Sequence, residues 1–388
     1  MFEFLNRRRQ VPERKSAPLI ALSLGGRARW APRTYQSLAR EGVLANAIVY
    51  RCVRMIAESA ASVPFLLYDG AAERTAHPLL DLLARPNPEE DGSAFFIRWY
   101  SFLQCAGNAY MEAALAGGEI RALYTLRPDR MCVVPGPRGW PAAYDYTVDG
   151  RTTRIARDGA FLPVLHATLF HPLDDHYGLS PLEACANAIE VHNAGAAWTK
   201  ALLDNAARPS GALVYRGPDG APGLTDEQFA RLKRELEDAY QGAGNAGRPM
   251  VLEGGLDWKS MSYTPADMDF STTRDVAARE IALAFGVPPM LLGIPGDNTY
   301  SNYREANLSF WRQTVLPLAG RTAAALTRWL APRFEGRALR LAIDADAVDA
   351  LAIERESIWD RLNAATFLTT DEKRAAAGYG PAAPGDLP

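Results

Sequence analysis

The stretch AFGVPPMLLGIPGDNTYSN, residues 284–302, separates two helical patterns and decides how the middle of the chain is organised. The pattern before it predicts a helix over residues 266–285, because Gly286 suits the left-handed position after a helix and the prolines that follow cannot continue one. Glycine, proline and asparagine residues then predict a loop over residues 291–301. A second helix is predicted from there to residue 330, bent or broken at Pro317.

The first of these helices has an apolar stripe, predicted to face the core, at Met268, Val276, Ile281, Ala284 and Phe285. Two helices that flank a short loop can line a passage, hinge a lid or pack as a plain hairpin. The pattern alone leaves these three arrangements open.

Length and composition limit the class of protein. The 388 residues fit two or three domains, or one elongated subunit of several parts. With 48% hydrophobic and 22% charged residues, the chain can build ordinary cores, which excludes wholesale disorder. The net charge of -3 argues against a protein that holds nucleic acid on a large basic face, because lysine and arginine carry phosphate binding. It remains compatible with a protein that lets nucleic acid slide past.

The four cysteines are Cys52, Cys105, Cys132 and Cys185, and they lie far apart in apolar surroundings. This distribution predicts buried free thiols in a reducing compartment rather than a disulfide framework. No apolar run has the length of a transmembrane helix, and the N-terminus lacks the pattern of a secretory signal, so we expect neither a membrane protein nor an exported one.

The first part of the chain is predicted to be α+β. Residues 1–42, rich in Arg, Pro and Gly, predict a flexible basic arm that is solvated or touches nucleic acid or another subunit. The following elements are predicted from periodicity and turn residues: helices over 43–63, 77–83 and from Ser93 to Gly107, a strand over 65–68, and short strands up to residue 170 with turns at Asp149-Gly150 and Asp158-Gly159.

A small insert is predicted between two long helices. Ser180 caps the first, which runs to about Ala206 and is rich in alanine. The insert has strands over 212–215, 250–252 and 256–259 around a charged helix over 225–240. Beyond residue 334, helical patterns cover 349–363 and 371–377.

Patterns typical of enzymes are weak. Gly242–Gly247 matches a bare dinucleotide-binding pattern, but a helix precedes it and a strand follows, so it is interpreted as a flexible turn. His171 and His176 flank Asp174-Asp175 with a spacing that fits no standard metal site, which favours a polar turn. We therefore predict no cofactor, no metal site and no catalytic residues.

Several motifs occur together in an order that is much more specific than any one of them. On these residues the chain resembles the portal proteins of tailed phages, in the siphophage-type branch typified by Hong Kong 97-like portals, and a gene transfer agent portal is similar in outline. The motifs are Asn46–Val53 with Ile56–Ser59, His77–Leu79 with Arg85–Pro88, Gly107–Tyr110, Tyr177–Leu182, Ala207–Gly211, Phe285–Pro289, and Tyr300–Asn302 with Glu305 and Asn307.

The resemblance implies the parts of an elongated portal subunit. They are an α+β wing over 43–179 with a long helix over 302–334, stem helices over 180–206 and 263–290, a small α/β clip over 207–262, a tunnel loop over 291–301, and a short helical crown with a tail over 335–388. Small residues on the alanine-rich stem helix would let neighbouring subunits approach closely.

The resemblance also implies a function. Twelve subunits would form a ring at one vertex of a capsid, and double-stranded DNA would pass through it during packaging and ejection, without sequence specificity. The implied partners are the major capsid protein, the large terminase and the head-tail adaptor. The implied location is a virion or phage-like particle assembled in the bacterial cytoplasm.

Two sets of residues are candidates for contact with these partners. The tunnel loop presents Asp297, Asn298, Thr299, Tyr300 and Ser301, and because none is a cation it can touch DNA without an ionic grip. On the clip helix, Arg231 and Arg234 either pair with partner proteins or form a solvated face.

Two other functions remain alternatives. The chain could be a soluble enzyme with a lid loop at 293–301, which a metal or a perturbed carboxylate in a cleft beneath that loop would favour. It could also be a minor capsid or adaptor protein of lower copy number. A portal should assemble as a large closed ring, which neither alternative requires.

Overall fold

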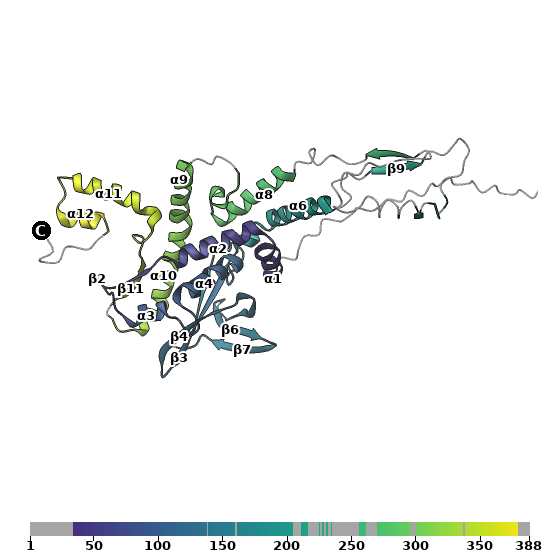
Figure 1. Ribbon diagram of the computed structural model, residues 1–388. Helices are drawn as coiled ribbons and strands as arrows, with labels where there is room; N and C mark the ends of the chain where they lie inside the picture. The colour runs from purple at the N-terminus through teal and green to yellow at the C-terminus, as the bar shows by residue number, and fades with distance from the viewer. Residues whose placement is uncertain are drawn as a thin grey trace, which may run out of the picture. The chain divides into compact units, whose positions relative to one another are not determined.

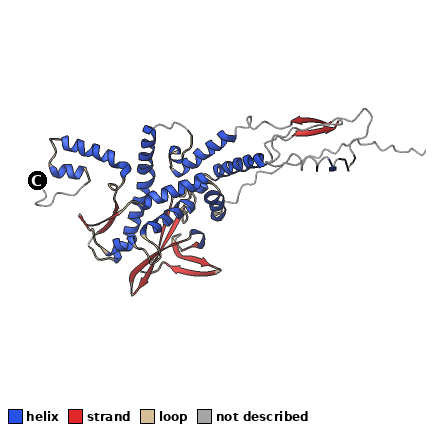
Figure 2. Cartoon of the chain, viewed as in Figure 1, coloured by secondary structure: helices blue, strands red, loops and turns tan. Residues whose placement is uncertain are grey.

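The computed structural model describes residues 34–204 apart from 138 and 160, 211–215, part of 225–234, 256–260, 270–295, and 300–378 apart from 337. These residues all belong to one compact unit, 32–388. The fold mixes helices with small sheets, which confirms the α+β prediction (Figures 1 and 2).

The described helices are α1 (Tyr35–Leu38), α2 (Ala47–Ala61), α3 (Pro78–Ala84), α4 (Gly92–Ala106), α5 (Pro181–Ala184), α6 (Ala186–Asp204), α8 (Phe270–Phe285), α9 (Tyr300–Phe310), α10 (Leu316–Leu330), α11 (Ala352–Ala364) and α12 (Thr370–Ala376). Among them, none combines the length and the apolarity of a membrane span.

The described strands are β1 (Phe65–Asp69), β2 (Ala72–Glu73), β3 (Asn108–Ala116), β4 (Glu119–Leu126), β5 (Met131–Pro135), β6 (Pro141–Val148), β7 (Arg151–Ala156), β8 (Val164–Thr168), β9 (Gly211–Tyr215), β10 (Leu256–Ser260) and β11 (Leu339–Ile343). They form antiparallel sheets in the orders β11-β1-β2, β4-β3-β8, β5-β6-β7 and β10-β9.

The main core lies where α2, α4 and α10 pack together and against the strands. The apolar face of α2, Val49, Val53, Ile56 and Ala60, is buried. Each fully buried Val or Ile stabilises the fold by about 1.5–3 kcal/mol relative to exposure, so this one helix face contributes substantially.

Strand β11 was not predicted from the sequence. It pairs with β1 so that Leu67 lies opposite Leu341, both buried. Residues 339–343 therefore join the sheet built by the start of the chain, although they lie within the predicted crown and tail. Short apolar runs carry too little periodicity to reveal a partner some 270 positions away.

Several predicted boundaries are wrong by a few residues. Asp91, not Ser93, caps α4, since its Oδ1 accepts the Ala94 N–H at 2.7 Å. The Asp149-Gly150 turn does join β6 to β7, whereas the strand after Asp158-Gly159 belongs to another sheet. The irregular arm predicted through residue 42 ends sooner, because a capping box at Thr34 starts α1 and a π-helical segment, Ala39–Leu44, follows it.

The cysteines are all free, and the prediction of burial holds for three of them. Cys52, Cys105 and Cys185 are buried, and that burial raises the pKa of each thiol to about 12. Cys132 is exposed, contrary to the prediction, because strand β5 turns successive side chains to opposite faces.

Candidate functional site

The two long helices predicted on either side of the insert lie next to each other as α6 and α8 (Figure 1). Ser180 begins the first as predicted, because its hydroxyl accepts the Glu183 N–H at 3.0 Å. The helix is not continuous, however. Cys185 leaves the helical conformation at φ -106° and ψ 19°, which divides the predicted helix into the short α5 and the long α6.

Helix α8 ends at Phe285, where the glycine and the prolines predicted an end, and its end forms a Schellman motif. Gly286 has φ +67°, its N–H donates to the Leu283 carbonyl, and the Val287 N–H donates to the Ala282 carbonyl at 2.9 Å. The buried side chain of Val287 completes the motif against the core. This closure fixes the direction in which the chain leaves α8.

The buried face of α8 differs from the predicted stripe. Ala277, Ala278, Ile281, Ala282 and Phe285 are buried. Ile281 and Phe285 confirm part of the prediction, and Ala284 is half-buried. Val276 contradicts it with 50% exposure, because the face of α8 that meets the core is centred on the alanines; Met268 lies outside the described residues.

The first residues of the predicted tunnel loop pack against α8. A 3-10 turn, Pro289–Leu292, follows α8, and Gly293 ends it with φ +71°. Ile294 is buried against Ala278 and Ala282, while the guanidinium of Arg279 donates to the Pro295 carbonyl. The first part of the predicted loop is therefore packed on α8.

The tip of the loop is only partly described. Asp297, Asn298 and Thr299 lie outside the described residues. Tyr300 and Ser301 form the first turn of α9, so the predicted loop is shorter than 291–301 at both ends.

The helix after the loop is continuous but changes register. Between α9 and α10 the segment Trp311–Val315 is π-helical, and the Leu316 N–H donates to the Trp311 carbonyl five residues back. Instead of the predicted break at Pro317, the helix has this π-helical turn just before the proline. The proline has no N–H group to donate to the carbonyl four residues back, so the regular α-helical bond is missing there. Within this turn the Thr314 hydroxyl donates to the Gly286 carbonyl at 2.6 Å, which joins the long helix to the end of α8.

Three buried asparagines join segments that lie far apart in the sequence, and all three belong to motifs that carry the family resemblance. The first is Asn46, which is 2% exposed. Its Oδ1 accepts the N–H groups of Ile48 and Val49, which caps α2, and its Nδ2 donates to His192 Nδ1 at 3.1 Å and Asn193 Oδ1 at 2.9 Å on α6. A single side chain thus both starts α2 and ties it to α6.

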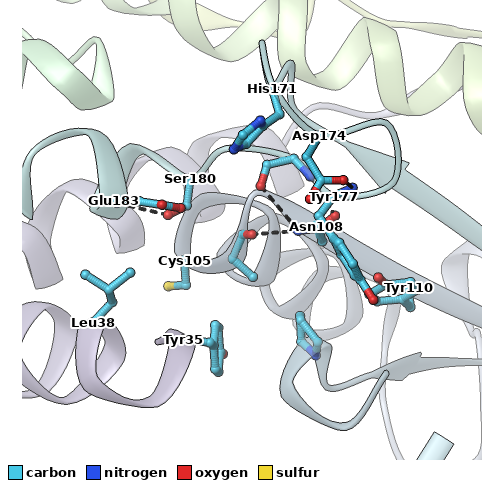
Figure 3. A pocket seen from close by; sticks show the side chains of 13 residues that line it. Tyr35, Leu38, Cys105, Asn108, Tyr110, His171, Asp174, Tyr177, Ser180 and Glu183 are labelled. Atoms are coloured by element: carbon cyan, nitrogen blue, oxygen red, sulfur yellow. Dashed lines mark hydrogen bonds between the residues drawn. The ribbon is translucent and has the colours of Figure 1, made fainter. Parts of the chain in front are cut away.

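The second is Asn108, at the start of β3 (Figure 3). Its Oδ1 accepts the Gly178 N–H and the Nε2–H of His166, each at 3.0 Å, and its Nδ2 donates to the Ala106 carbonyl. Burial first, and then Arg157, lowers the pKa of His166 to about 3, so the ring is neutral. The backbones of Gly107 and Gly178 touch so closely that a Cβ on either one would overlap the other's carbonyl oxygen.

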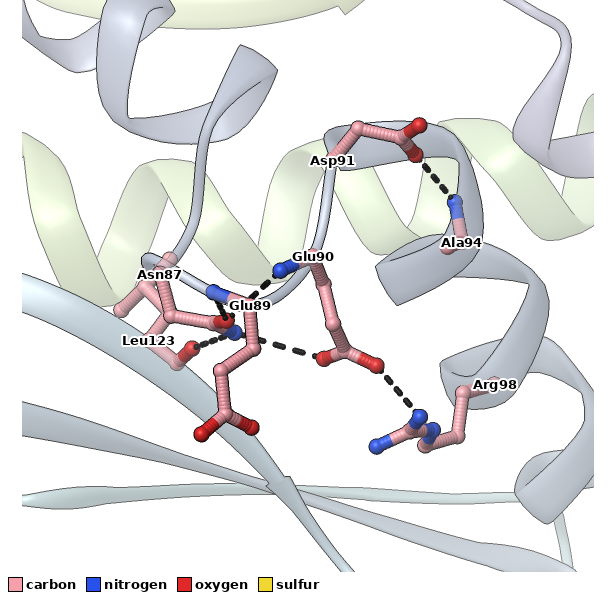
Figure 4. Close-up of polar contacts among 7 residues, drawn as sticks. All are labelled: Asn87, Glu89, Glu90, Asp91, Ala94, Arg98 and Leu123. Atoms are coloured by element: carbon pink, nitrogen blue, oxygen red, sulfur yellow. Dashed lines mark hydrogen bonds and ion pairs between the residues drawn. The ribbon is translucent and has the colours of Figure 1, made fainter.

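The third is Asn87, in the turn before α4 (Figure 4). Its Oδ1 accepts the N–H groups of Glu89 and Glu90, each at 3.0 Å, and its Nδ2 donates to the Leu123 carbonyl on β4. Glu90 in turn forms an ion pair with Arg98 on α4. In the sequence these asparagines stand out only as parts of motifs, and their burial in the structure reveals what they bond.

A pocket of about 310 Å³ lies beside Asn108 and the start of α5, and two polar side chains of its lining, Asp174 and Ser180, bond to nearby backbone N–H groups. Asp174 Oδ1 accepts the N–H groups of His176 and Tyr177, which confirms the predicted polar turn and lowers the pKa of Asp174. The Ser180 hydroxyl, also in the lining, is the helix cap. Within the described residues no three His, Cys, Asp or Glu side chains could share a metal ion.

The predicted insert is described in part. Strands β9 and β10 pair antiparallel, and a capping box at Thr225 starts a helix in which Arg231 and Arg234 are exposed. The strand predicted over 250–252 and the glycine-rich stretch Gly242–Gly247 lie outside the described residues.

Comparison with known proteins assigns the chain to a family. A family model described as phage portal protein matches residues 47–378. A solved chain in the neck of a native gene transfer agent particle, computed with C12 symmetry, is 51% identical and covers 91% of this chain and 95% of its own, with a TM-score of 0.70. The portal protein of Enterobacteria phage HK97 is 25% identical over 313 residues, 76% of this chain and 69% of the phage protein.

A solved HK97-family portal protein from Corynebacterium diphtheriae shares the fold at 15% identity, with 79% of this chain and 96% of that chain covered and a TM-score of 0.58. The motifs and the match along most of the chain agree with each other. This protein is therefore a member of the phage portal protein family, whose members are structural proteins rather than enzymes.

Proposed function

We propose that this chain forms a twelve-subunit ring at one vertex of a virion or phage-like capsid, and that double-stranded DNA enters and leaves through the ring. The observation that carries the proposal is the family match over residues 47–378 together with a 51% identical relative in a gene transfer agent neck. In this proposal α6 and α8 are the stem, the insert between them is the clip, and the loop after α8 is the tunnel loop.

Assembly is the first property to test. Twelve copies of the 42.4 kDa chain have a mass of about 509 kDa, whereas an enzyme or an adaptor need not exceed a few copies. Mass photometry of the purified protein should show this species, and negative-stain images should show closed rings. A compact monomer that persists under capsid-assembly conditions would refute the proposal.

The tunnel loop is proposed to touch DNA sterically. Its base, with Ile294 buried and Pro295 held by Arg279, would keep the tip at a constant position. The tip residues Asp297 to Ser301 include no cation, so passing phosphates would meet no ionic contact that has to be broken at each step.

Deletion of residues 297–299 tests this role without shortening α9, which begins at Tyr300. Rings should still form, but particles should package or retain less DNA, measured as DNA mass per particle. A variant with the same three positions replaced by Gly-Ser-Gly keeps the length and should retain more function than the deletion. Wild-type DNA content in the deletion variant would contradict the steric role.

The exposed Arg231 and Arg234 are proposed to bind the large terminase or the head-tail adaptor, with the major capsid protein contacting another part of the subunit. Reversing both to Glu should reduce recovery of the terminase or adaptor in a pull-down. Reversing the exposed Arg321 and Arg328 on α10 provides a control of equal charge change. Equal recovery from both double variants would exclude the proposed contact.

A further inference from the structure

The pocket of about 310 Å³ beside Asn108, which we call the Asn108 pocket, has an acidic lining (Figure 3). Its volume lies at the lower end of the usual range for ligand sites, so one side chain or one small molecule would fill it. Among the described residues, its lining includes the carboxylates of Asp174 and Glu183 but no Lys or Arg. A cavity lined by charges of one sign favours a ligand of the opposite sign, here a cation.

Two polar groups of the lining have no partner within the described part of the chain. Glu183 is half-buried, and its N–H is bonded to the Ser180 hydroxyl, but its carboxylate makes no hydrogen bond or ion pair there. Tyr110 is 1% exposed, and its hydroxyl is unpaired. A ligand with N–H donors would give both groups a partner, and a guanidinium can donate two parallel bonds to one carboxylate.

Two tyrosine rings belong to the same lining. The ring of Tyr177 is fixed because its hydroxyl accepts the Val133 N–H on β5 at 2.8 Å, and Tyr35 on α1 is half-buried. Arg127, the cation near Tyr35, is already bound to Asp129 through two hydrogen bonds of 3.0 and 2.7 Å. Planar cations stack on aromatic faces, so these rings suit a guanidinium from outside the chain better than an ammonium.

The segment that carries His171 and Asp174 also exposes large apolar side chains beside the pocket. Phe170 is 83% exposed and Leu173 is 92% exposed. The His171 Nδ1 accepts the Leu173 N–H at 3.0 Å, which leaves Nε2 as the donor of this lining residue. Apolar surface and a donor for a carbonyl group both suit a cation that is part of a polypeptide, rather than a free small cation.

We propose that the Asn108 pocket binds an arginine side chain of a polypeptide partner. The guanidinium pairs with the carboxylate of Glu183 and lies against the rings of Tyr35 and Tyr177. The exposed side chains of Phe170 and Leu173 cover the residues next to this arginine. The proposal concerns a single subunit and stands whether or not the ring forms.

Small probes test the chemistry of the site on the full-length wild-type chain. Saturation-transfer NMR measures binding of acetyl-arginine amide, which carries both the guanidinium and peptide groups. Acetyl-citrulline amide, its neutral isostere, should bind at least about tenfold more weakly, because the charge-assisted pair with Glu183 is lost. Agmatine keeps the guanidinium without the peptide groups and should also bind more weakly. Equal binding of the arginine and citrulline probes would overturn the proposal, and tighter binding of agmatine would overturn the polypeptide partner.

Variants locate the binding. Glu183→Gln should weaken binding of acetyl-arginine amide at least about tenfold, while the helix start survives because Ser180 holds the backbone N–H. Glu356→Gln on α11 removes an exposed carboxylate outside the pocket and should leave the affinity unchanged. Tyr35→Phe should keep the affinity, whereas Tyr35→Leu should reduce it, because the ring face and not the hydroxyl makes the contact.

Thermal melting of each variant checks the fold before its affinity is compared. A Glu183→Gln chain that melts like the wild type and binds acetyl-arginine amide equally well would overturn the proposal. Equal affinities of the Tyr35→Phe and Tyr35→Leu chains would overturn the contact with that ring. The comparison of arginine with citrulline uses only the wild-type chain, so it decides the role of charge even where a variant does not fold.

Discussion

Replacement of Asn46 by Ala should destabilise the joint between α2 and α6 more than an ordinary surface change. Loss of the side-chain cap costs about 1 kcal/mol. The change also leaves His192 Nδ1 and Asn193 Oδ1 without their donor. A buried polar group left without its partner costs about 1–3 kcal/mol. Because both groups are half-buried and water can partly replace the donor, we expect the lower part of that range, about 1–2 kcal/mol. The total is about 2–3 kcal/mol.

Asn46→Asp separates the two parts of this loss. A carboxylate oxygen still accepts the Ile48 and Val49 N–H groups, so the cap survives, but the donor toward His192 is lost. Burial, followed by Arg274, lowers the pKa of His192 in the native chain, and a carboxylate at position 46 would raise it. Compared with the native chain, the Asp variant should therefore lose less of the stability that depends on His192 as the pH falls and that ring becomes protonated, while the Ala variant should show no such difference.

Urea unfolding of both variants, with Asn363→Ala as an exposed control, measures the free energies. Hydrogen exchange locates the effect, since the amides of Ile48 and Val49 should exchange faster in the Ala variant only. A loss below about 0.5 kcal/mol for Asn46→Ala, the size expected of a surface change, would show that the reasoning from buried hydrogen bonds is wrong.

The remaining predictions concern the glycine contact, the buried histidine and the loop. Gly107→Ala should prevent folding or lower the melting temperature far more than Gly117→Ala. Both glycines have positive φ, but only at Gly107 would the new Cβ overlap a carbonyl oxygen, that of Gly178. Equal melting temperatures of the two variants would contradict this packing. Because the folded pKa of His166, about 3, lies below its unfolded value, the unfolded chain binds more protons between pH 6.5 and 3, and stability from this group falls as the pH drops through that window. His166→Gln should flatten that part of the stability profile, and an unchanged slope would exclude His166 as a source. Asp297→Lys should make DNA passage slower and more salt-dependent, which packaging rates at two ionic strengths would reveal or disprove.

Local signals in the sequence predicted the helix ends and turns that depend on neighbouring residues. Ser180 caps a helix because its hydroxyl reaches the N–H three residues on, and Gly286 ends one because it alone tolerates positive φ at low cost. Asp149-Gly150 makes a hairpin for the same local reason. None of these features needs a distant partner.

Features that depend on distant partners were missed or misplaced. Val276 is apolar at the right spacing for burial but is exposed, because the core meets α8 on its alanine side. The π-helical turn before Pro317 forms because proline lacks an N–H group. The turn lies over Trp311–Val315, where the Thr314 hydroxyl also donates to the Gly286 carbonyl at the end of α8, a distant contact that the sequence did not reveal. The candidate loop residues Asp297 to Thr299 remain a prediction.

By itself the amino-acid sequence determined the α+β class, the positions of most helices and the family, because periodicity, caps and ordered motifs are written in nearby residues. Only the tertiary structure decided that Leu341 lies opposite Leu67, that Asn46 joins two helices, and that Val276 and Leu283 are exposed. Such facts depend on which surfaces meet after the chain has folded back on itself. Local pattern limits each segment's own conformation but does not select its partner.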